Sequence, residues 1–276
     1  MKLGTCTPIF ECFGDDRYKK MKEYGFDYAD YSLSGELEGR TEEEYRDIAL
    51  REKALADEAG VVIWQTHGPW RYPPHDETPE HRAERMETMK RSIRLTAMIG
   101  CKNWVIHPLM PFGPSDDFVL DEFLRINKEF FTELLAYAKA LDVTICFENM
   151  PMRGLTISSP EKTLEFIRDM NDDHFKFCLD TGHCTVIGKD PVAAVRMAGS
   201  DLRVMHVHDN HGTYNDEHLV PYMGIIDWKE YYKALVEIGF DGVFSLELWW
   251  NGFIDKASDE TRIKALKLVV DDIMND

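Results

Sequence analysis

The sequence predicts an α/β fold, a (β/α)8 TIM barrel that forms a single domain over residues 1–276. Three observations support this fold class. About eight short apolar segments alternate with amphipathic, helix-like segments along the whole chain. Most of these segments are continuously apolar, as expected for parallel strands that are covered on both faces. No linker or low-complexity segment interrupts the pattern, and 276 residues are an ordinary length for one such barrel.

The predicted strands are short. In chain order they are KLGTC (2–6), FDYADYS (26–32), VVIWQTH (61–67), NWVIHP (103–108), VTICFEN (143–149), FKFCLD (175–180), RVMHVHD (203–209) and VFSLEL (243–248). Four of them follow a glycine at the end of an amphipathic segment, where a left-handed backbone stops a helix. These glycines are Gly25, Gly60, Gly100 and Gly239.

Capping residues mark where the predicted helices begin. Three pairs combine an N-cap side chain with a proline at the first helical position. These pairs are Thr78–Pro79, Ser159–Pro160 and Asp190–Pro191. Two further segments, 41–44 and 227–230, have the spacing of a capping box. Strands and capped helices therefore alternate in the order that a parallel barrel requires.

The charge balance of the chain is strongly acidic. It has 32 Lys and Arg residues against 50 Asp and Glu residues, a formal net charge of −18. A protein held on DNA needs a basic face to displace the counterions of the phosphates, so nucleic acid is disfavoured as a partner. No 18-residue apolar run predicts a membrane helix, and the N-terminus lacks the apolar core of a signal peptide. Six cysteines without CxxC spacing predict free thiols and a cytoplasmic protein.

Polar residues gather where the predicted strands end. In a (β/α)8 barrel the active site lies at the C-terminal ends of the strands. The residues at those ends are His67, His107, Glu148, Asp180, His206 with His208, and Glu247. One such histidine alone is more often structural, but six of the eight predicted strands end in this way. Because carboxylates that share a buried site repel one another, we expect a divalent cation between them.

The predicted ligands combine carboxylate oxygen with imidazole nitrogen. Such a set suits Zn²⁺ or Mn²⁺, and also Mg²⁺ or Co²⁺, rather than soft metals. Glu148 and Glu247 come from opposite sides of the predicted ring, so a substrate between them would meet a carboxylate on each face. This arrangement suits removal of a proton from one face and its return on the other. The same two carboxylates could instead act only as metal ligands.

Four short motifs resemble those of a known family. They are FENM (147–150), LDTGH (179–183), HVHDN (206–210) and SLEL (245–248). Nearly the whole chain resembles the xylose-isomerase-like TIM barrels, which are grouped with sugar-phosphate isomerases/epimerases and AP endonuclease family 2. The resemblance implies a metal-dependent barrel acting on carbohydrates, with a shared ligand set of Glu148, Asp180, His206 and Glu247. It also implies that His183 contacts a substrate oxygen or a second metal.

The residues alone leave open whether His206 or His208 is the ligand. Strand alternation puts both side chains on the same face. The resemblance favours His206, because the H-x-x-D pattern of the family ends at Asp209. An alignment with ketose 3-epimerases would select His208 instead. If His206 is the ligand, His208 becomes a candidate substrate contact.

Two branches of the family imply different reactions. Ketose 3-epimerases use a pair like Glu148 and Glu247 as acid and base, although this sequence lacks the arginine that they place after the HVHDN segment. Endonuclease IV carries three zinc ions, and all nine of its ligand positions are matched here. The five that extend the shared set are His67, His107, His183, Asp216 and His218. This match implies a multinuclear zinc site and phosphoester hydrolysis, although the acidic composition opposes a nucleic-acid substrate.

The leading hypothesis is an enzyme, a metal-dependent isomerase or epimerase of a sugar, sugar phosphate or polyol. The alternatives are an endonuclease-IV-like zinc hydrolase and a barrel that binds a carbohydrate without changing it. We expect a small carbohydrate-type substrate, with Trp70 as an aromatic contact and Arg153 as a contact for a phosphate or carboxylate. These residues leave open whether the protein forms an oligomer.

Overall fold

Eight parallel strands form the centre of the fold. They are β1 (Lys2–Cys6), β2 (Tyr28–Ser32), β3 (Val62–His67), β4 (Asn103–Ile106), β5 (Thr144–Glu148), β6 (Phe175–Asp180), β7 (Leu202–His206) and β8 (Val243–Leu246). The sheet order is β7-β6-β5-β4-β3-β2-β1-β8, and a parallel bridge between Val207 and Leu246 joins its two ends. The computed structural model, which describes residues 1–32, 39–70, 75–76, 78–115 and 119–275, thus confirms the predicted (β/α)8 barrel.

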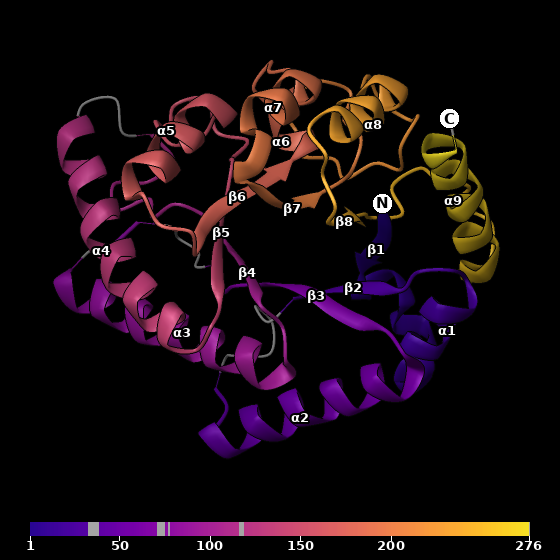
Figure 1. The fold of residues 1–276 in the computed structure, drawn as a ribbon, viewed down its shortest axis with the longest axis horizontal. Coiled ribbons are helices and arrows are strands. Elements are labelled where there is room, and N and C mark those ends of the chain that lie inside the picture. The colour runs from indigo at the N-terminus through magenta and orange to yellow at the C-terminus, as the bar shows by residue number, and fades with distance from the viewer. Residues whose placement is uncertain (33–38, 71–74, 77, 116–118, 276) are drawn as a thin grey trace.

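Helices surround the ring of strands, as Figure 1 shows. They are α1 (Arg17–Glu23), α2 (Glu42–Ala59), α3 (Pro79–Ile99), α4 (Leu120–Ala140), α5 (Pro160–Met170), α6 (Thr181–Val186), α7 (Pro191–Ala198), α8 (Trp228–Glu237) and α9 (Asp259–Met274). Two 3₁₀ segments, Thr7–Asp16 and Gly199–Asp201, precede α1 and β7. The large core lies between the strands and this outer layer of helices.

The predicted helix boundaries are confirmed where capping chemistry marks them. Four helices begin with an N-cap side chain that accepts a hydrogen bond from a backbone N–H of the first turn. These N-caps are Thr78 for α3, Ser159 for α5, Asp190 for α7 and Asp227 for α8. Thr41 and Glu44 form a reciprocal capping box at the start of α2. Gly60 and Gly100 end α2 and α3 with φ angles of 68° and 86°, a conformation that side chains disfavour.

Four predicted strands end earlier in the structure: β4 ends at Ile106 instead of 108, β5 ends at Glu148 instead of 149, and β7 and β8 also end early. We predicted strands over 203–209 and 243–248, but β7 ends at His206 and β8 ends at Leu246. Asp209 instead forms an antiparallel bridge with Leu219, which draws the chain out of the parallel sheet. His208 and Glu247 therefore lie just beyond the strand ends, on the side of the barrel where its βα loops begin.

A small apolar layer fills the barrel interior beneath its C-terminal end. It is a separate buried cluster of Val105, Cys146, Cys178 and Val204. Each of these residues comes two positions before a polar strand-end residue, and side chains in a strand alternate with a period of two. The polar residues above this layer are His107, Glu148, Asp180 and His206. On β4 to β7 the barrel interior is therefore apolar below and polar at its mouth.

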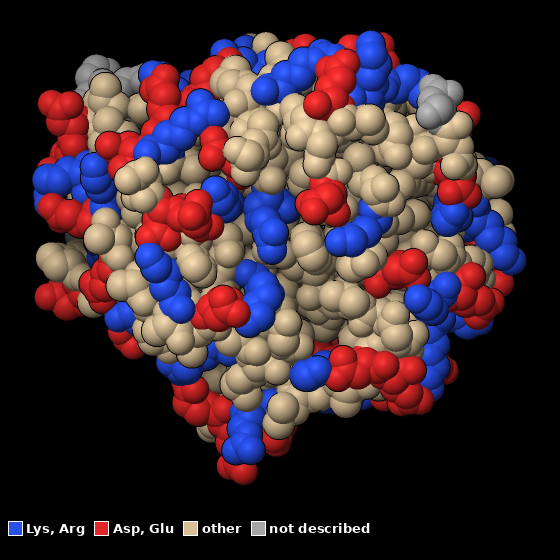
Figure 2. All heavy atoms as spheres, viewed as in Figure 1, with Lys and Arg blue, Asp and Glu red and all other residues tan. Residues whose placement is uncertain are grey.

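The surface carries both signs of charge. On the face in Figure 2, Lys and Arg side chains are interspersed with Asp and Glu side chains. Within the described ranges, no helix is long and apolar enough to cross a membrane. All six cysteines are free, and all except Cys12 are buried.

Candidate metal centre

A cavity of about 430 Å³ opens at the C-terminal end of the barrel. Its polar wall consists of Ser32, His67, His107, Glu148, His183, Asp216, His218 and Glu247. Its apolar wall consists of Trp70, Met150, Pro151, Met152 and Trp249. His67 and Glu148 are the last residues of β3 and β5, and Glu247 follows β8 directly. The strand ends thus place the polar residues where the fold class predicts an active site.

Three groups of side chains bring together all nine residues of the predicted multinuclear set, with the ligand atoms of each group within 4.8 Å of one another. We call them the two-histidine group (His67, His107 and Glu148), the central group (Glu148, Asp180, His206 and Glu247) and the Asp216 group (His183, Asp216 and His218). Glu148 belongs to the first two. His206 joins the other three expected ligands in the central group, whereas His208 lies in a further candidate group with His218 and Glu247.

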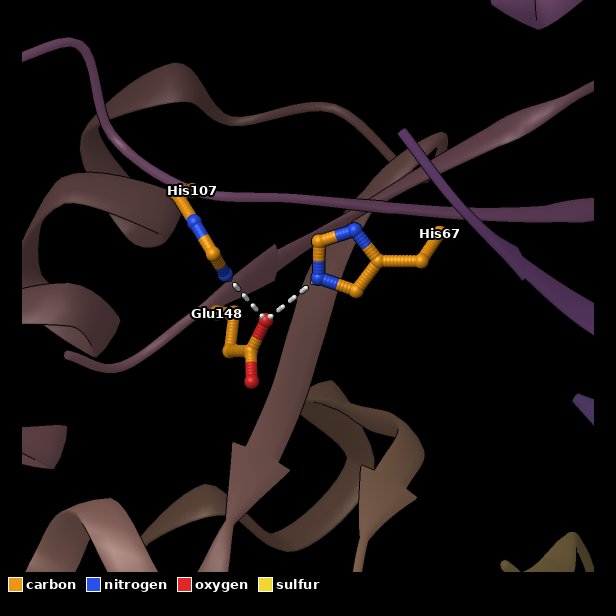
Figure 3. A group of neighbouring side chains, drawn as sticks. All are labelled: His67, His107 and Glu148. Carbon is orange, nitrogen blue, oxygen red and sulfur yellow. Dashed lines mark ion pairs between the residues drawn. The ribbon is translucent and has the colours of Figure 1, made fainter. Parts of the chain in front are cut away.

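The two-histidine group converges on one oxygen atom, as Figure 3 shows. His67 Nε2 lies 3.3 Å from Glu148 Oε2, and His107 Nε2 lies 3.0 Å from the same oxygen. Oε2 is buried, yet among the described residues it has no partner in hydrogen-bonding geometry. The two imidazole nitrogens and this buried oxygen thus lie close together without forming hydrogen bonds. Such an arrangement fits the ligand atoms of a bound cation.

Backbone carbonyls fix the tautomers of three of these histidines. The Nδ1 atoms of His67, His183 and His218 lie 2.8, 2.8 and 3.1 Å from the carbonyl oxygens of Gly68, Asn149 and Glu247. A carbonyl oxygen only accepts, so each Nδ1 must carry the proton. Each ring therefore presents Nε2 to its group, which is how a histidine is prepared to bind a metal ion.

The central group surrounds His206, whose side chain is fully buried. Its Nδ1 lies 2.8 Å from Glu148 Oε1, 3.4 Å from Glu247 Oε2 and 3.9 Å from Asp180 Oδ2. Burial opposes ionisation of Glu148, but His206 and His107 outweigh it and hold the pKa of this carboxyl well below its usual range. The ion pairs of these carboxylates in the described structure are with histidines. Their counter-charge must therefore come from imidazolium or from a bound cation.

The Asp216 group lies beside the central group at the cavity. His183 Nε2 and His218 Nε2 lie 3.1 and 3.0 Å from the same oxygen, Oδ2 of Asp216. Burial lowers the pKa of His183, but Asp180 and Asp216 outweigh it and raise this pKa to about 10. In the same way Asp216 and Glu247 raise the pKa of His218 to about 9 against the effect of burial. Without a metal ion, both rings are therefore protonated at neutral pH.

Metal binding at the Asp216 group should release protons. At pH 8 the metal-free chain carries a proton on Nε2 of His183 and of His218, because their pKa values are about 10 and about 9. A metal ion must displace both, so we expect about two protons released per ion and an affinity that rises with pH up to about 10, the pKa of His183. Titration calorimetry in buffers of different ionisation enthalpy measures this number. Release that stays the same in His183→Asn and His218→Asn variants would contradict the assignment.

His208 lies beneath the Asp216 group and does not line the cavity. Its side chain is fully buried, and Nε2 lies 2.9 Å from Asp180 Oδ2. Its ring stacks on His218 with centroids 3.9 Å apart, and His218 stacks on Trp249 at 4.3 Å. A Cβ atom added to Gly182 would lie 2.0 Å from the His208 ring. His208 therefore supports Asp180 and His218 from behind, rather than facing the space where a substrate fits.

The two other predicted substrate contacts, Trp70 and Arg153, lie in different places relative to the cavity. Trp70 lines the cavity and is 45% exposed. Arg153 is not in the cavity wall: its Nη2 donates to the carbonyl oxygen of Val186 at 3.0 Å, and its guanidinium lies 4.3 Å from the ring centre of Tyr214. These contacts hold the guanidinium, and Arg153 lies outside the wall of this cavity.

Sequence reasoning missed two residues that support the ligands. Asp30 on β2 is buried, and its Oδ2 lies 3.2 Å from Nε2 of His206. Asn149 exchanges hydrogen bonds with the backbone of Asp180, donating to its carbonyl oxygen at 3.0 Å and accepting from its N–H at 2.8 Å. The only signal for Asp30 was an acidic residue in the middle of an otherwise apolar strand. For Asn149 it was its position directly after Glu148.

Comparisons with known proteins place this arrangement in context. Inosose isomerase of Bacillus subtilis is 27% identical over 167 residues, which cover 59% of this chain and 60% of that protein. D-psicose 3-epimerase of Ruminiclostridium cellulolyticum is 27% identical over 214 residues, which cover 74% of this chain and 69% of that protein. The chain spans about two fifths to two thirds of the length of the curated relatives that it matches.

Solved structures share the whole architecture. The crystal structure of a D-tagatose 3-epimerase-like protein matches with a TM-score of 0.77 and 26% identity, covering 100% of this chain and 98% of that one. The family model described as xylose isomerase-like TIM barrel matches residues 18–269. The match covers most of the chain and all three ligand groups, and the protein belongs to the xylose isomerase-like TIM-barrel family.

Proposed function

We propose that this protein is a metal-dependent isomerase or epimerase of a small carbohydrate-type substrate. The observation that carries the proposal is the joint position of Glu148 and Glu247. They lie at the C-terminal ends of β5 and β8, which are not neighbours in the ring, yet both belong to the central group and both line the same cavity. The inosose isomerase and the D-psicose 3-epimerase among the relatives are named for reactions of this class.

The central group would hold the metal ion through Glu148, Asp180, His206 and Glu247. Its oxygen and nitrogen donors suit Zn²⁺ or Mn²⁺, and also Mg²⁺ or Co²⁺. A bound divalent ion would polarise a carbonyl or hydroxyl group of the substrate and so make the neighbouring C–H bond more acidic.

The two glutamates are not equally placed for proton transfer. The Glu148 side chain is 1% exposed and both of its oxygens face histidines, whereas the Glu247 side chain is 26% exposed at the cavity. A proton acceptor must reach the substrate to within hydrogen-bonding distance. We therefore assign the first proton removal to Glu247. To return a proton on the other face, Glu148 would have to begin protonated and give that proton to carbon; exchange with solvent would then deprotonate Glu247 and reprotonate Glu148.

The apolar wall of the cavity suits the C–H face of a sugar ring or a polyol. Trp70 and Trp249 are 45% and 53% exposed, and both line the cavity. Aromatic rings present a flat apolar surface with a partial negative charge, which matches the polarised C–H groups of such a face. A bound carbohydrate would direct its hydroxyl oxygens toward the central group and place its C–H face against the apolar wall. The proposed substrate is therefore a sugar, a sugar phosphate or a polyol.

The two additional ligand groups favour a second candidate function, zinc-dependent hydrolysis of a small phosphoester. The proton transfer proposed above uses one ion, and the central group alone can hold it. The two-histidine group and the Asp216 group add donors beside it that have no evident use in a one-metal proton transfer. Ions held close together can stabilise both the attacking and the leaving oxygen of a phosphoester.

The number of bound metal ions separates the two candidates. If all three groups are filled, we expect about three zinc ions per chain after dialysis against zinc and removal of the excess. Asp216→Asn should remove about one of them, while Glu217→Gln, at a neighbouring carboxylate that contacts His211, should remove none. Metal analysis by mass spectrometry gives the count. One ion per wild-type chain would remove the hydrolase candidate and leave the isomerase.

A further inference from the structure

Asp30 is a buried acidic residue outside the three ligand groups and outside the cavity wall. It is 3% exposed, and its Oδ2 accepts a hydrogen bond from Gln65 Nε2 at 3.0 Å. Its ion-pair partner among the described residues is His206, whose buried Nε2 lies 3.2 Å from the same oxygen, a close approach that falls outside hydrogen-bonding geometry. A carboxylate buried in a barrel interior is costly unless charged or polar groups compensate it. His206 is therefore the group that accounts for an acid at this position.

The contact between Asp30 and His206 crosses the barrel. Asp30 is on β2 and His206 is on β7, and β1 and β8 lie between these strands in the ring. Gln65 on β3 makes a second crossing, because its Nε2 also lies 3.2 Å from the carbonyl oxygen of Met205. The ring of His206 and the backbone just before it are thus both held from the opposite wall.

His206 is oriented differently from the other ligand histidines. In His67, His183 and His218 a backbone carbonyl holds Nδ1, and Nε2 faces the ligand group. In His206 the arrangement is reversed, because Nδ1 faces Glu148 and Nε2 faces Asp30. An imidazole ring rotated by half a turn would present the carbon Cδ2, which cannot bind a metal ion, to the central group and would move Nε2 away from Asp30. Asp30 is placed to prevent that rotation.

We propose that Asp30 is a positioning residue for the metal centre, one that holds His206 with Nδ1 directed at Glu148, Asp180 and Glu247. The inference rests on the proposed metal dependence but not on which reaction follows. A carboxylate behind a ligand histidine fixes the ring and increases its basicity as a ligand. Removing such a partner typically weakens metal binding by about 10- to 100-fold.

Metal affinity tests the proposal directly. We expect Asp30→Asn to bind Co²⁺ about 10- to 100-fold more weakly than the wild type in a titration followed by visible absorption. The control is Asp76→Asn, which neutralises a carboxylate that is also buried but pairs with Arg82 and Arg85 on α3. It should lose stability and keep its Co²⁺ affinity. An Asp30→Asn affinity within about twofold of the wild type would overturn the inference.

A measurement on the wild type covers the case in which Asp30→Asn does not fold. In chain labelled with ¹⁵N-histidine and loaded with ¹¹³Cd²⁺, we expect scalar coupling between the metal and Nδ1 of His206, with the proton on Nε2. His206→Gln identifies the resonance. Coupling to Nε2 instead would overturn the role of Asp30. A wild-type chain that binds no divalent metal would contradict the proposed function itself.

Discussion

Replacing Glu247 by glutamine should reduce turnover by about 10²- to 10⁴-fold, the usual contribution of a general acid or base. Glutamine has nearly the same shape as glutamate and keeps one oxygen toward the metal ligands, but it cannot accept a proton from carbon. Because Asp180, His206 and Glu148 remain, the variant should keep much of its metal. The rate constant kcat should therefore fall far more than the affinity for substrate.

Two readouts make this test specific. The first is interconversion of ketohexoses and of inososes, the compounds for which the relatives are named. The second is exchange of a carbon-bound proton of the substrate into deuterated water, which proton transfer requires and simple binding does not. Glu217→Gln is the matched control, because Glu217 lies in the same region but contacts His211 and is absent from the cavity wall. A fully active Glu247→Gln enzyme would exclude the proposed proton role.

Replacing Gly182 by alanine should destabilise the protein by about 1–3 kcal/mol or more, the usual effect of overpacking a tight core. The added Cβ would lie 2.0 Å from Cε1 and 2.3 Å from Nδ1 of His208. The ring cannot withdraw, because His218 stacks at 3.9 Å and Nε2 is engaged by Asp180 at 2.9 Å. Either His208 or α6 must shift, and both movements disturb Asp180.

Urea denaturation and metal content measure this effect together. Gly154→Ala is the control, since its Cβ would meet only the side chain and backbone of Ser115, at 3.0 Å and beyond, near the surface. We expect a large loss of unfolding free energy and of bound metal in Gly182→Ala, and a small change in Gly154→Ala. If the two variants behaved alike, the close approach of His208 would not be what requires glycine in the LDTGH segment.

The architecture was predictable because its signals are local. Most strands are short apolar runs, and several helix boundaries have a capping side chain or glycine, as at Thr41 and Gly60. The position of His67, Glu148 and Glu247 at one end of the barrel followed from the same reasoning, since parallel strands all end on one side.

Other parts of the site depend on contacts that sequence spacing does not encode. Period-two alternation treats His206 and His208 alike, but the chain leaves the parallel sheet after His206, and the two rings end in different environments. The contact of Asp30 with His206 joins strands 176 positions apart by residue number. Arg153 is directed by a loop that brings it against Val186 and Tyr214, and loop paths follow from tertiary packing.

The bridge that closes the barrel has a mechanical consequence. Val207 donates to the carbonyl oxygen of Ser245 at 2.8 Å and accepts from the N–H of Glu247 at 3.1 Å, so the sheet is joined between His206 and Glu247. An ion held by those two residues would link the ends of β7 and β8, where the barrel closes. Binding to the folded state alone contributes about 2.7 kcal/mol of stability when the free ion is at a hundred times its Kd. Weakening the metal centre would therefore also loosen the barrel at its point of closure.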